Sequence, residues 1–390
     1  MAGLQQISNV ELVLTSRCNL KCAYCFEDDK KDGSMSWEIA RRSLDLALGS
    51  AEPRPSVIFF GGEPTLEFDT IRRAIAYVEE NRPRWKRFRW AVVTNGVLLG
   101  EAEIEFLATH RVDVQISFDG VPEAQLQRGK GTFETLDALL DALRRERPYF
   151  YRRRVSVAMT LSPRTVPFLA RSVEYFLGKG VSLIRIGPKL TFDPYWKLEM
   201  IDELDRQFSA VRRASIEHYR CTGRVPVISF QKLGPSRIPR PVRLGMCGVG
   251  RGSQIAVDVD GTAHGCAMFS KSFQKFPSAF LRDRLEGIQL GDVRDVELES
   301  RLATYPERVK QAEIFDDKQL KRSSYGSCRD CRFLATCSVC PTAIGHIPGN
   351  ADPHRVPDFL CAFNLVSLKH RALFPLSRPK AVSRKGGAAA

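Results

Sequence analysis

The sequence predicts an α/β protein in which an open, TIM-like arc of six β/α units precedes a cysteine-rich, metal-binding region. Strand and helix patterns alternate six times between residues 10 and 230, which is typical of a parallel sheet covered by helices. Polar or glycine-containing motifs follow most of the predicted strands. Seven of the eleven cysteines lie between residues 246 and 366. With 390 residues, 43% of them hydrophobic, the chain is long enough for two such parts.

The six units are assigned from hydrophobic periodicity and from the turn signals that separate them. Strands are expected at residues 10–15, 56–60, 88–94, 112–118, 154–161 and 181–186. Helices are expected at residues 36–48, 68–81, 101–109, 133–145, 165–177 and 195–220, the first capped by Ser34 or Ser36. Four strands end at the turn dipeptides Gly61-Gly62, Asn95-Gly96, Asp119-Gly120 and Gly187-Pro188. Because six units close only part of a barrel, functional residues are expected at the C-terminal strand ends.

The predicted division of the chain follows its changes in composition. Residues 1–221 form the (β/α)6 core, and residues 222–245, rich in Pro, Arg and Gly, form a bridge. Residues 246–366 form the cysteine-rich domain, with a short strand at 254–259. Residues 367–390 are expected to be a basic, disordered tail.

The composition of the chain indicates where the protein is located and which kinds of partner it has. No apolar run is long enough to cross a membrane, and residues 1–9 lack the features of a secretory signal, so a cytoplasmic protein is expected. In a chain without a secretory signal, clustered cysteines favour metal binding, and an odd number of them, eleven, cannot all pair as disulfides. The net charge of +14 is spread along the sequence without a nucleic-acid-binding module. A solvated basic surface is therefore favoured over a nucleic-acid or other acidic partner.

Three closely spaced cysteines follow the first predicted strand. Cys18, Cys22 and Cys25 have the spacing CxxxCxxC, so their thiolates can hold one face of a [4Fe–4S] cluster. One iron would remain open to a substrate or cofactor, as at catalytic metal sites. The alternatives are a zinc site or incidental cysteines. A structural zinc site requires a fourth ligand nearby. None is close in sequence, because the next histidine is His110 and the next cysteine is Cys221.

This spacing, with Tyr24 before the last cysteine, resembles the signature of the radical SAM superfamily. Gly61-Gly62-Glu63-Pro64 matches the GGEP motif of that family, in which the glycines let backbone approach a ligand and Glu63 can pair with an ammonium group. Further family positions follow the next two strands, and Arg128 resembles an arginine that contacts the cofactor carboxylate, although a surface arginine would explain it equally well. The implied cofactor-binding residues are Tyr24, Gly61, Gly62, Glu63, Pro64, Asn95, Ser117, Asp119 and Arg128.

The resemblance implies the chemistry of the cofactor. In the family, S-adenosylmethionine binds the open iron, and one electron from the cluster cleaves a C–S bond to give a 5′-deoxyadenosyl radical. That radical abstracts a hydrogen atom from the substrate. The protein orients the cofactor and the substrate and excludes water. An electron donor such as flavodoxin or ferredoxin is implied.

The second group of cysteines resembles the SPASM domain, which binds auxiliary [4Fe–4S] clusters. Its pattern differs once from the family, with two residues instead of three between Cys337 and Cys340. The resemblance implies an outer cluster on Cys328, Cys331, Cys337 and Cys361 and an inner one on Cys247, Cys266 and Cys340. Zinc ribbons are the alternative, because paired CxxC motifs also suit zinc.

The inner cluster is one cysteine short of four. Its last iron could be open to a substrate thiolate, filled by another residue or closed by Cys221, or the cluster could be smaller. Cys221 lies outside both patterns and is expected to be a buried thiol near a helix end.

The SPASM resemblance implies a peptide or protein substrate. Ala267 follows Cys266 where the sulfatase-maturing members have an aspartate, and no cysteine lies between Cys247 and Cys266, so sulfatase maturation is disfavoured. The first strand begins near residue 10, which implies a separate leader-recognition protein or direct recognition. Our first hypothesis is oxidative modification of a ribosomally made peptide, by thioether or other crosslinking or by epimerisation. The alternative is a small molecule or cofactor precursor as substrate, and a non-enzymatic scaffold is disfavoured because the GGEP motif would have no purpose.

Overall fold

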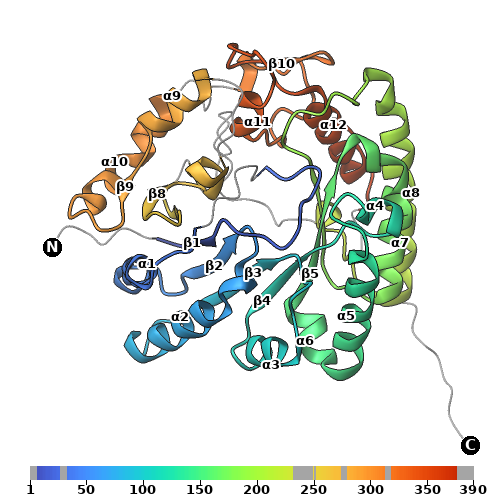
Figure 1. The fold of residues 1–390 in the computed structure, drawn as a ribbon. Helices are drawn as coiled ribbons and strands as arrows, with labels where there is room; N and C mark the ends of the chain where they lie inside the picture. The colour runs from blue at the N-terminus through green and yellow to red at the C-terminus, as the bar shows by residue number, and fades with distance from the viewer. Residues whose placement is uncertain are drawn as a thin grey trace, which may run out of the picture.

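Six parallel strands form the main sheet, in the order β6-β5-β4-β3-β2-β1, in a computed structural model of the chain (Figure 1). The structure describes residues 7–26, 33–231, 249, 252–273, 279–311 and 318–375. Cys247, most of the predicted bridge and residues 376–390 lie outside the described residues. The strands are β1 (Asn9–Thr15), β2 (Ser56–Gly61), β3 (Arg89–Thr94), β4 (Asp113–Ser117), β5 (Val155–Leu161) and β6 (Ile184–Pro188). The predicted (β/α)6 arc is confirmed.

One helix or more connects each strand to the next and covers the outside of the sheet. The main helices are α1 (Trp37–Gly49), α2 (Phe68–Asn81), α3 (Glu101–Thr109), α5 (Thr132–Glu146), α7 (Leu169–Lys179) and α8 (Ile201–Thr222). Two short helices, α4 (Pro122–Gln125) and α6 (Pro148–Arg154), were not predicted. Ser36 is the N-cap of α1, as expected, and its hydroxyl accepts a hydrogen bond from the Ile39 amide at 3.3 Å.

Prolines explain one difference between the predicted and observed helices. Residues 163–168 form a 3₁₀ helix, η2 (Pro163–Phe168), and the α-helix begins only at Leu169. Pro167 has no amide hydrogen, so it cannot donate within a continuous α-helix. The predicted start at residue 165 was therefore wrong.

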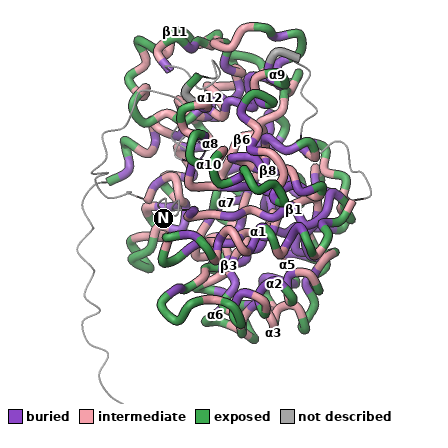
Figure 2. The backbone as a smooth tube through the Cα atoms, turned by 90° about the vertical axis from the view of Figure 1, so that its left-hand side faces the viewer, coloured by how far each residue is buried: buried purple, intermediate pink, exposed green. Residues whose placement is uncertain are grey.

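The strands alternate between the helical layer and the barrel interior. In β5 every second residue, Val155, Val157, Met159 and Leu161, is buried. Figure 2 shows the buried residues along the strands and the inner faces of the surrounding helices. The residues between them, Ser156, Ala158 and Thr160, are partly exposed.

The C-terminal region continues the same sheet. Strand β7 (Gln254–Val257) pairs in parallel with β1, with Leu12 opposite Val257, and β8 (Thr262–His264) and β9 (Gly291–Asp292) follow antiparallel. The sheet therefore has nine strands, and the same apolar core extends from the barrel into this region. The cysteine-rich region is thus built onto the barrel next to the strand that precedes Cys18.

The remaining elements lie around the upper end of the barrel as drawn in Figure 1. They are α9 (Ala279–Gly287), α10 (Leu298–Gln311), the hairpin β10 (Arg322–Ser323) and β11 (Gly326–Ser327), α11 (Pro341–Gly345) and α12 (Asp358–Ala372). The predicted tail boundary at residue 366 falls inside α12 and was wrong. The helix continues because Phe363 and His370 pack on Phe208 of α8.

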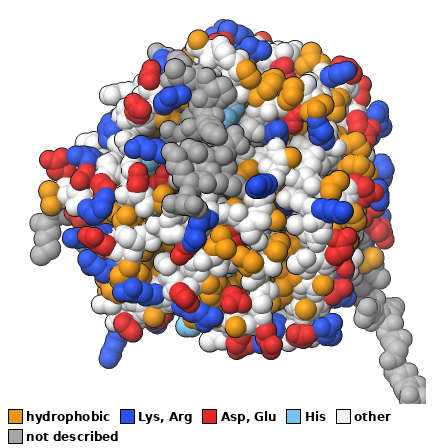
Figure 3. Space-filling view, in the orientation of Figure 1, with side chains coloured by type: hydrophobic (Ala, Val, Ile, Leu, Met, Phe, Trp, Pro, Cys, Tyr) orange, Lys and Arg blue, Asp and Glu red, His pale blue; other side chains and the backbone are white. Residues whose placement is uncertain are grey.

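The surface in Figure 3 carries basic and acidic side chains interspersed, without one dominant basic patch on this face. This agrees with a solvated basic surface. Among the described residues, no helix combines the length and hydrophobicity needed to cross a lipid bilayer.

Candidate active site

The loop with the first three cysteines leaves the C-terminal end of β1 and contacts two neighbouring segments. The Glu63 amide, just after β2, donates to the Arg17 carbonyl at 2.9 Å. The Ala23 amide donates to the Gln127 carbonyl at 2.8 Å. Cys18, Cys22 and Cys25 are all partly exposed on this loop. The loop is therefore fixed by backbone contacts on both sides, and its cysteines remain accessible.

Gly61 and Gly62 allow the end of β2 to lie directly against this loop. A Cβ atom on Gly62 would lie 2.3 Å from the Arg17 carbonyl oxygen, and one on Gly61 would lie 2.4 Å from the Thr15 carbonyl oxygen. Gly61 also has a φ of 134°, which disfavours any other residue. The sequence predicted that these glycines approach a ligand, and the structure shows in addition that they approach the backbone of the cysteine loop. Pro64 follows as the first residue of the 3₁₀ helix η1 (Pro64–Glu67).

Glu63 is completely buried, and both of its carboxylate oxygens accept hydrogen bonds from the protein. Oε1 accepts from the Thr65 amide at 3.1 Å and from the hydroxyls of Thr65 and Thr94 at 2.5 and 2.7 Å. Oε2 accepts from the Asn95 amide at 2.7 Å. Burial raises the pKa of Glu63, and these hydrogen bonds act in the opposite direction.

These contacts join the ends of β2 and β3 through the Glu63 carboxylate. Asn95 is thereby placed beside the cysteine loop, where its Nδ2 donates to Asn19 Oδ1 at 2.7 Å and lies 3.9 Å from Cys18 Sγ. The pairing with a cofactor ammonium group that the motif predicts stays a prediction.

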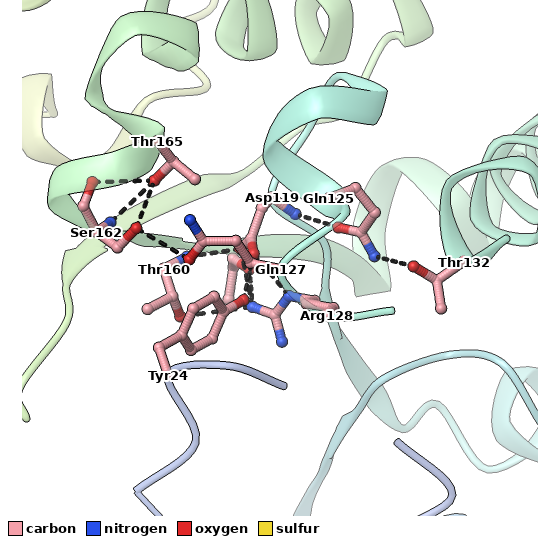
Figure 4. Close-up of polar contacts among 10 residues, drawn as sticks. Tyr24, Asp119, Gln125, Gln127, Arg128, Thr132, Thr160, Ser162 and Thr165 are labelled. Carbon is pink, nitrogen blue, oxygen red and sulfur yellow. Dashed lines mark hydrogen bonds and ion pairs between the residues drawn. The ribbon is translucent and has the colours of Figure 1, made fainter. Parts of the chain in front are cut away.

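Asp119 and Arg128 form a buried ion pair on the other side of the loop (Figure 4). Arg128 Nε and Nη2 donate to the two oxygens of Asp119 at 3.0 and 2.9 Å. The Thr160 amide donates to Asp119 Oδ1 at 2.8 Å, and the Tyr24 hydroxyl donates to Oδ2. Burial alone would lower the pKa of Arg128, but the adjacent Asp119 more than reverses this effect. Arg128 is thus a buried, paired residue, which decides against the surface alternative.

Tyr24 connects this pair to the cysteine loop. Its ring also lies 5.3 Å from the Arg128 guanidinium, and burial raises the pKa of its hydroxyl well above the usual value. Ser117 is the last residue of β4 and is partly buried. The structure therefore brings all the predicted cofactor-binding residues to the C-terminal ends of β1 to β4. It also adds Gln127 and Thr160, which the sequence did not single out, and it shows that Thr94 of the predicted Thr94-Asn95-Gly96 motif donates to Glu63.

Two further sites are lined by the C-terminal cysteines. Cys328, Cys331, Cys337 and Cys361 surround one cavity, hereafter the outer site. Cys266, Cys337 and Cys340 line a pocket of about 340 Å³, hereafter the inner site, which also contacts Pro188 at the end of β6. In the described parts of the chain, no three metal-binding side chains converge on a single point, and the cysteines lie around cavities instead.

The chemistry of these thiols suits a metal cluster. Burial raises the pKa of Cys337 to about 12 and that of Cys361 to about 11, so the free thiols are protonated at neutral pH. Iron binding would compensate by holding them as thiolates. At the inner site, Cys340 Sγ lies 2.9 Å from the Thr342 hydroxyl. The ligand sets predicted for both clusters therefore fit the cavities, except for Cys247, which lies outside the described residues.

Cys221 is not part of either site. It lies in α8, but it is exposed, so the expected buried thiol was wrong. Helix α8 ends near Val227, which pairs with Ile184 at the start of β6, whereas the inner site contacts the other end of that strand. Cys221 therefore lies at the opposite end of the barrel and cannot close the inner cluster.

Comparison with known proteins agrees with this geometry. The model of the radical SAM superfamily matches residues 12–165, which include the cysteine loop, Gly61-Gly62-Glu63 and the Asp119–Arg128 pair. The matched part of the chain, residues 12–165, is a radical SAM domain. The match implies S-adenosylmethionine and a [4Fe–4S] cluster as cofactors, and the loop of Cys18, Cys22 and Cys25 has the cysteine spacing expected for that cluster.

Two curated relatives cover parts of the radical SAM chain. An uncharacterised protein of Methanocaldococcus jannaschii is 28% identical over 178 residues, covering 44% of this chain and 59% of that protein. A cysteine-type anaerobic sulfatase-maturating enzyme of Clostridium novyi is 32% identical over 117 residues, covering 28% of this chain and 31% of that enzyme. The matches thus span less than two thirds of these relatives.

Two solved structures cover nearly the whole radical SAM chain. Native anSMEcpe with bound AdoMet and the Kp18Cys peptide has a TM-score of 0.70 at 18% identity, covering 94% of this chain and 96% of that one. SuiB of Streptococcus suis bound to its precursor peptide SuiA has a TM-score of 0.54 at 14% identity, covering 92% of this chain and 76% of that one. The shared fold includes the C-terminal region as well as the barrel.

Proposed function

We propose that this radical SAM enzyme oxidatively modifies a ribosomally made peptide. The observation that carries the proposal is the placement of the two cysteine-lined sites at the same end of the barrel as the radical SAM loop. The inner site contacts the C-terminal end of β6, and the loop with Cys18, Cys22 and Cys25 follows the C-terminal end of β1. A substrate oxidised at the strand ends would thus lie next to groups able to take up electrons.

The proposed site residues act by binding and orienting the cofactor. Cys18, Cys22 and Cys25 would hold the radical SAM cluster, and the bound cofactor supplies a 5′-deoxyadenosyl radical. The ion pair with Asp119 uses Nε and Nη2 of Arg128, and in this proposal Nη1 would donate to a cofactor carboxylate. Ser117 lies at the adjacent strand end. Glu63 acts indirectly, by holding the Asn95 backbone beside the cysteine loop.

The auxiliary clusters are also part of the proposal. Cys328, Cys331, Cys337 and Cys361 would hold the outer cluster, and Cys266 and Cys340, with Cys247, the inner one. Because Cys221 is remote, three cysteines remain for the inner cluster. Its fourth iron would be open, which favours thioether formation on a peptide cysteine.

A peptide substrate is supported by the fold shared with anSMEcpe and SuiB, both of which have been solved with bound peptides. Ala267 argues against the sulfatase-maturing reaction. The methyl side chain of Ala267 cannot act as a base, and it is buried. A separate leader-recognition protein and an electron donor of the flavodoxin or ferredoxin type are the proposed partners.

The test combines cofactor cleavage with mass spectrometry of a candidate peptide. Anaerobic, reconstituted protein with dithionite should form 5′-deoxyadenosine, and replacing Cys18, Cys22 and Cys25 by Ala should abolish this while leaving the C-terminal iron. A crosslinked product would be about two mass units lighter than the peptide, because two hydrogens are removed. Cofactor cleavage that persists in the triple variant would refute the assigned radical site. Turnover of a small molecule but no peptide would favour the alternative substrate class.

A further inference from the structure

A buried lysine lies between the two cysteine-lined sites. Lys318, the first residue of the 3₁₀ helix η9 (Lys318–Leu320), lines both the outer and the inner site. Cys337 also lines both, so Lys318 and Cys337 lie in the wall that the two sites share. The side chain of Lys318 belongs to the buried part of the structure, with 2% of the residue exposed.

The position of the Lys318 ammonium group is fixed by backbone. Nζ donates to the Leu334 carbonyl at 2.7 Å and to the Cys337 carbonyl at 3.0 Å. Both acceptors belong to the segment that carries Cys337, which the resemblance assigns to the outer cluster. The positive charge is thereby held next to the thiols that line the two sites.

A second buried lysine offers an internal comparison. Lys321 is 1% exposed, and its Nζ donates to the Pro353 carbonyl at 2.8 Å. Lys321 lines the outer site but not the inner one. The two lysines are therefore alike in chemistry and burial but differ in which sites they adjoin.

A fixed positive charge affects the reduction of an iron–sulfur cluster. Reduction adds one electron and hence one negative charge, so a nearby cation stabilises the reduced form and raises the reduction potential. The effect is large where water is excluded, because the effective dielectric constant is low. Burial of the ammonium group thus makes its charge more effective on any cluster beside it.

We propose that Lys318 is a positioning residue that raises the reduction potentials of both auxiliary clusters, and that Lys321 does so mainly for the outer one. This inference rests on the proposed function, because it requires clusters in both sites. It assigns Lys318 a role in making the two sites electron acceptors during substrate oxidation. The group acts by its charge and does not ligate iron.

The test is a redox titration followed by electron paramagnetic resonance. The protein carries Cys18→Ala, Cys22→Ala and Cys25→Ala, so that only the auxiliary clusters contribute to the signal. Dithionite is the reductant, and Cys331→Ala and Cys340→Ala assign the outer and inner signals. The variants compared are Lys318→Gln, which keeps a hydrogen-bond donor but removes the charge, and Lys321→Gln as the matched control.

We expect Lys318→Gln to lower the equilibrium constant for reduction of both clusters by roughly tenfold, which is about 59 mV for a one-electron couple. Lys321→Gln should lower the equilibrium constant for reduction of the outer cluster and change that of the inner cluster less than twofold. Unchanged reduction potentials in Lys318→Gln, with iron and sulfide contents equal to those of the parent, would overturn the role of Lys318 but not the proposed function. Absence of iron and sulfide from the parent protein itself would contradict the auxiliary clusters, and with them the proposed function.

If Lys318→Gln loses iron, Lys318→Arg distinguishes a role of the charge from a role in packing. This variant keeps the charge and changes the shape of the side chain. An iron content equal to that of the parent, with equilibrium constants for reduction within twofold of the parent values, would support a role of the charge. Loss of iron from the arginine variant as well would assign Lys318 a packing role and overturn the inference.

Discussion

Replacement of Glu63 by Gln tests whether this residue binds the cofactor directly or positions its neighbours. The glutamine side chain can keep one oxygen toward Thr65 and Thr94, but its amide group would face the Asn95 amide that now donates to Oε2 at 2.7 Å. A hydrogen bond to a charged group contributes roughly 1.5–3 kcal/mol, and an unsatisfied buried donor costs about 1–3 kcal/mol. We therefore expect a loss of about 3 kcal/mol in the free energy of unfolding, together with weaker cofactor binding.

Two measurements on the same protein separate the possibilities. Urea unfolding gives the change in stability, and calorimetric titration with S-adenosylmethionine gives the change in affinity. Glu79→Gln is the control, because Glu79 pairs with Arg82 at the surface and should contribute less than about 1 kcal/mol. If Glu63→Gln lost cofactor affinity tenfold or more at unchanged stability, Glu63 would contact the cofactor directly and the positioning role would be wrong.

Three other perturbations follow from the described geometry. Asp119→Asn should destabilise the protein by about 3–5 kcal/mol in urea unfolding, because it leaves the buried Arg128 without its counterion; a loss below about 1 kcal/mol would contradict this. Gly62→Ala should reduce 5′-deoxyadenosine formation at least tenfold, whereas Gly49→Ala, whose added Cβ meets nothing within 4 Å, should leave it unchanged. Burial lowers the pKa of His370, so the folded state binds this proton less readily than the unfolded state. Stability should therefore fall as the pH drops below about 6.5, and His370→Gln should reduce the loss between pH 7.5 and 5.5 by up to about 1 kcal/mol; equal losses in both proteins would refute the assignment.

The strands and helices of the barrel were predictable because the signals for each element lie within its own stretch of sequence. Each strand has a run of apolar or β-branched residues, and turn dipeptides such as Asn95-Gly96 mark where several of them stop. Helix α2 begins and ends at the predicted residues, since its apolar positions recur with a helical period. Errors occurred where a single residue overrides such a pattern, as Pro167 does before α7.

The pairings that build the site were not visible in the sequence. Asp119 and Arg128 are nine residues apart, and the resemblance that picked out Arg128 does not show that it is buried and paired with Asp119. The donors to Glu63 come partly from the next strand, so the motif alone suggested only its pairing with an ammonium group. Lys318 and Lys321 lie in a charged segment that resembles an exposed turn, and only the fold shows that both are buried.

The pairing of β7 with β1 makes the cysteine-rich region a structural partner of the barrel. Removing that region would leave β1 as an edge strand, with a row of backbone amides and carbonyls open to pairing with other molecules. A truncated barrel should therefore aggregate, even though its six units form a recognisable fold. The same contact orders the events of folding, because β1 is synthesised about 240 residues before the strand that completes its pairing. The strand that leads into the cysteine loop thus gains its second neighbour only when the C-terminal region has been made.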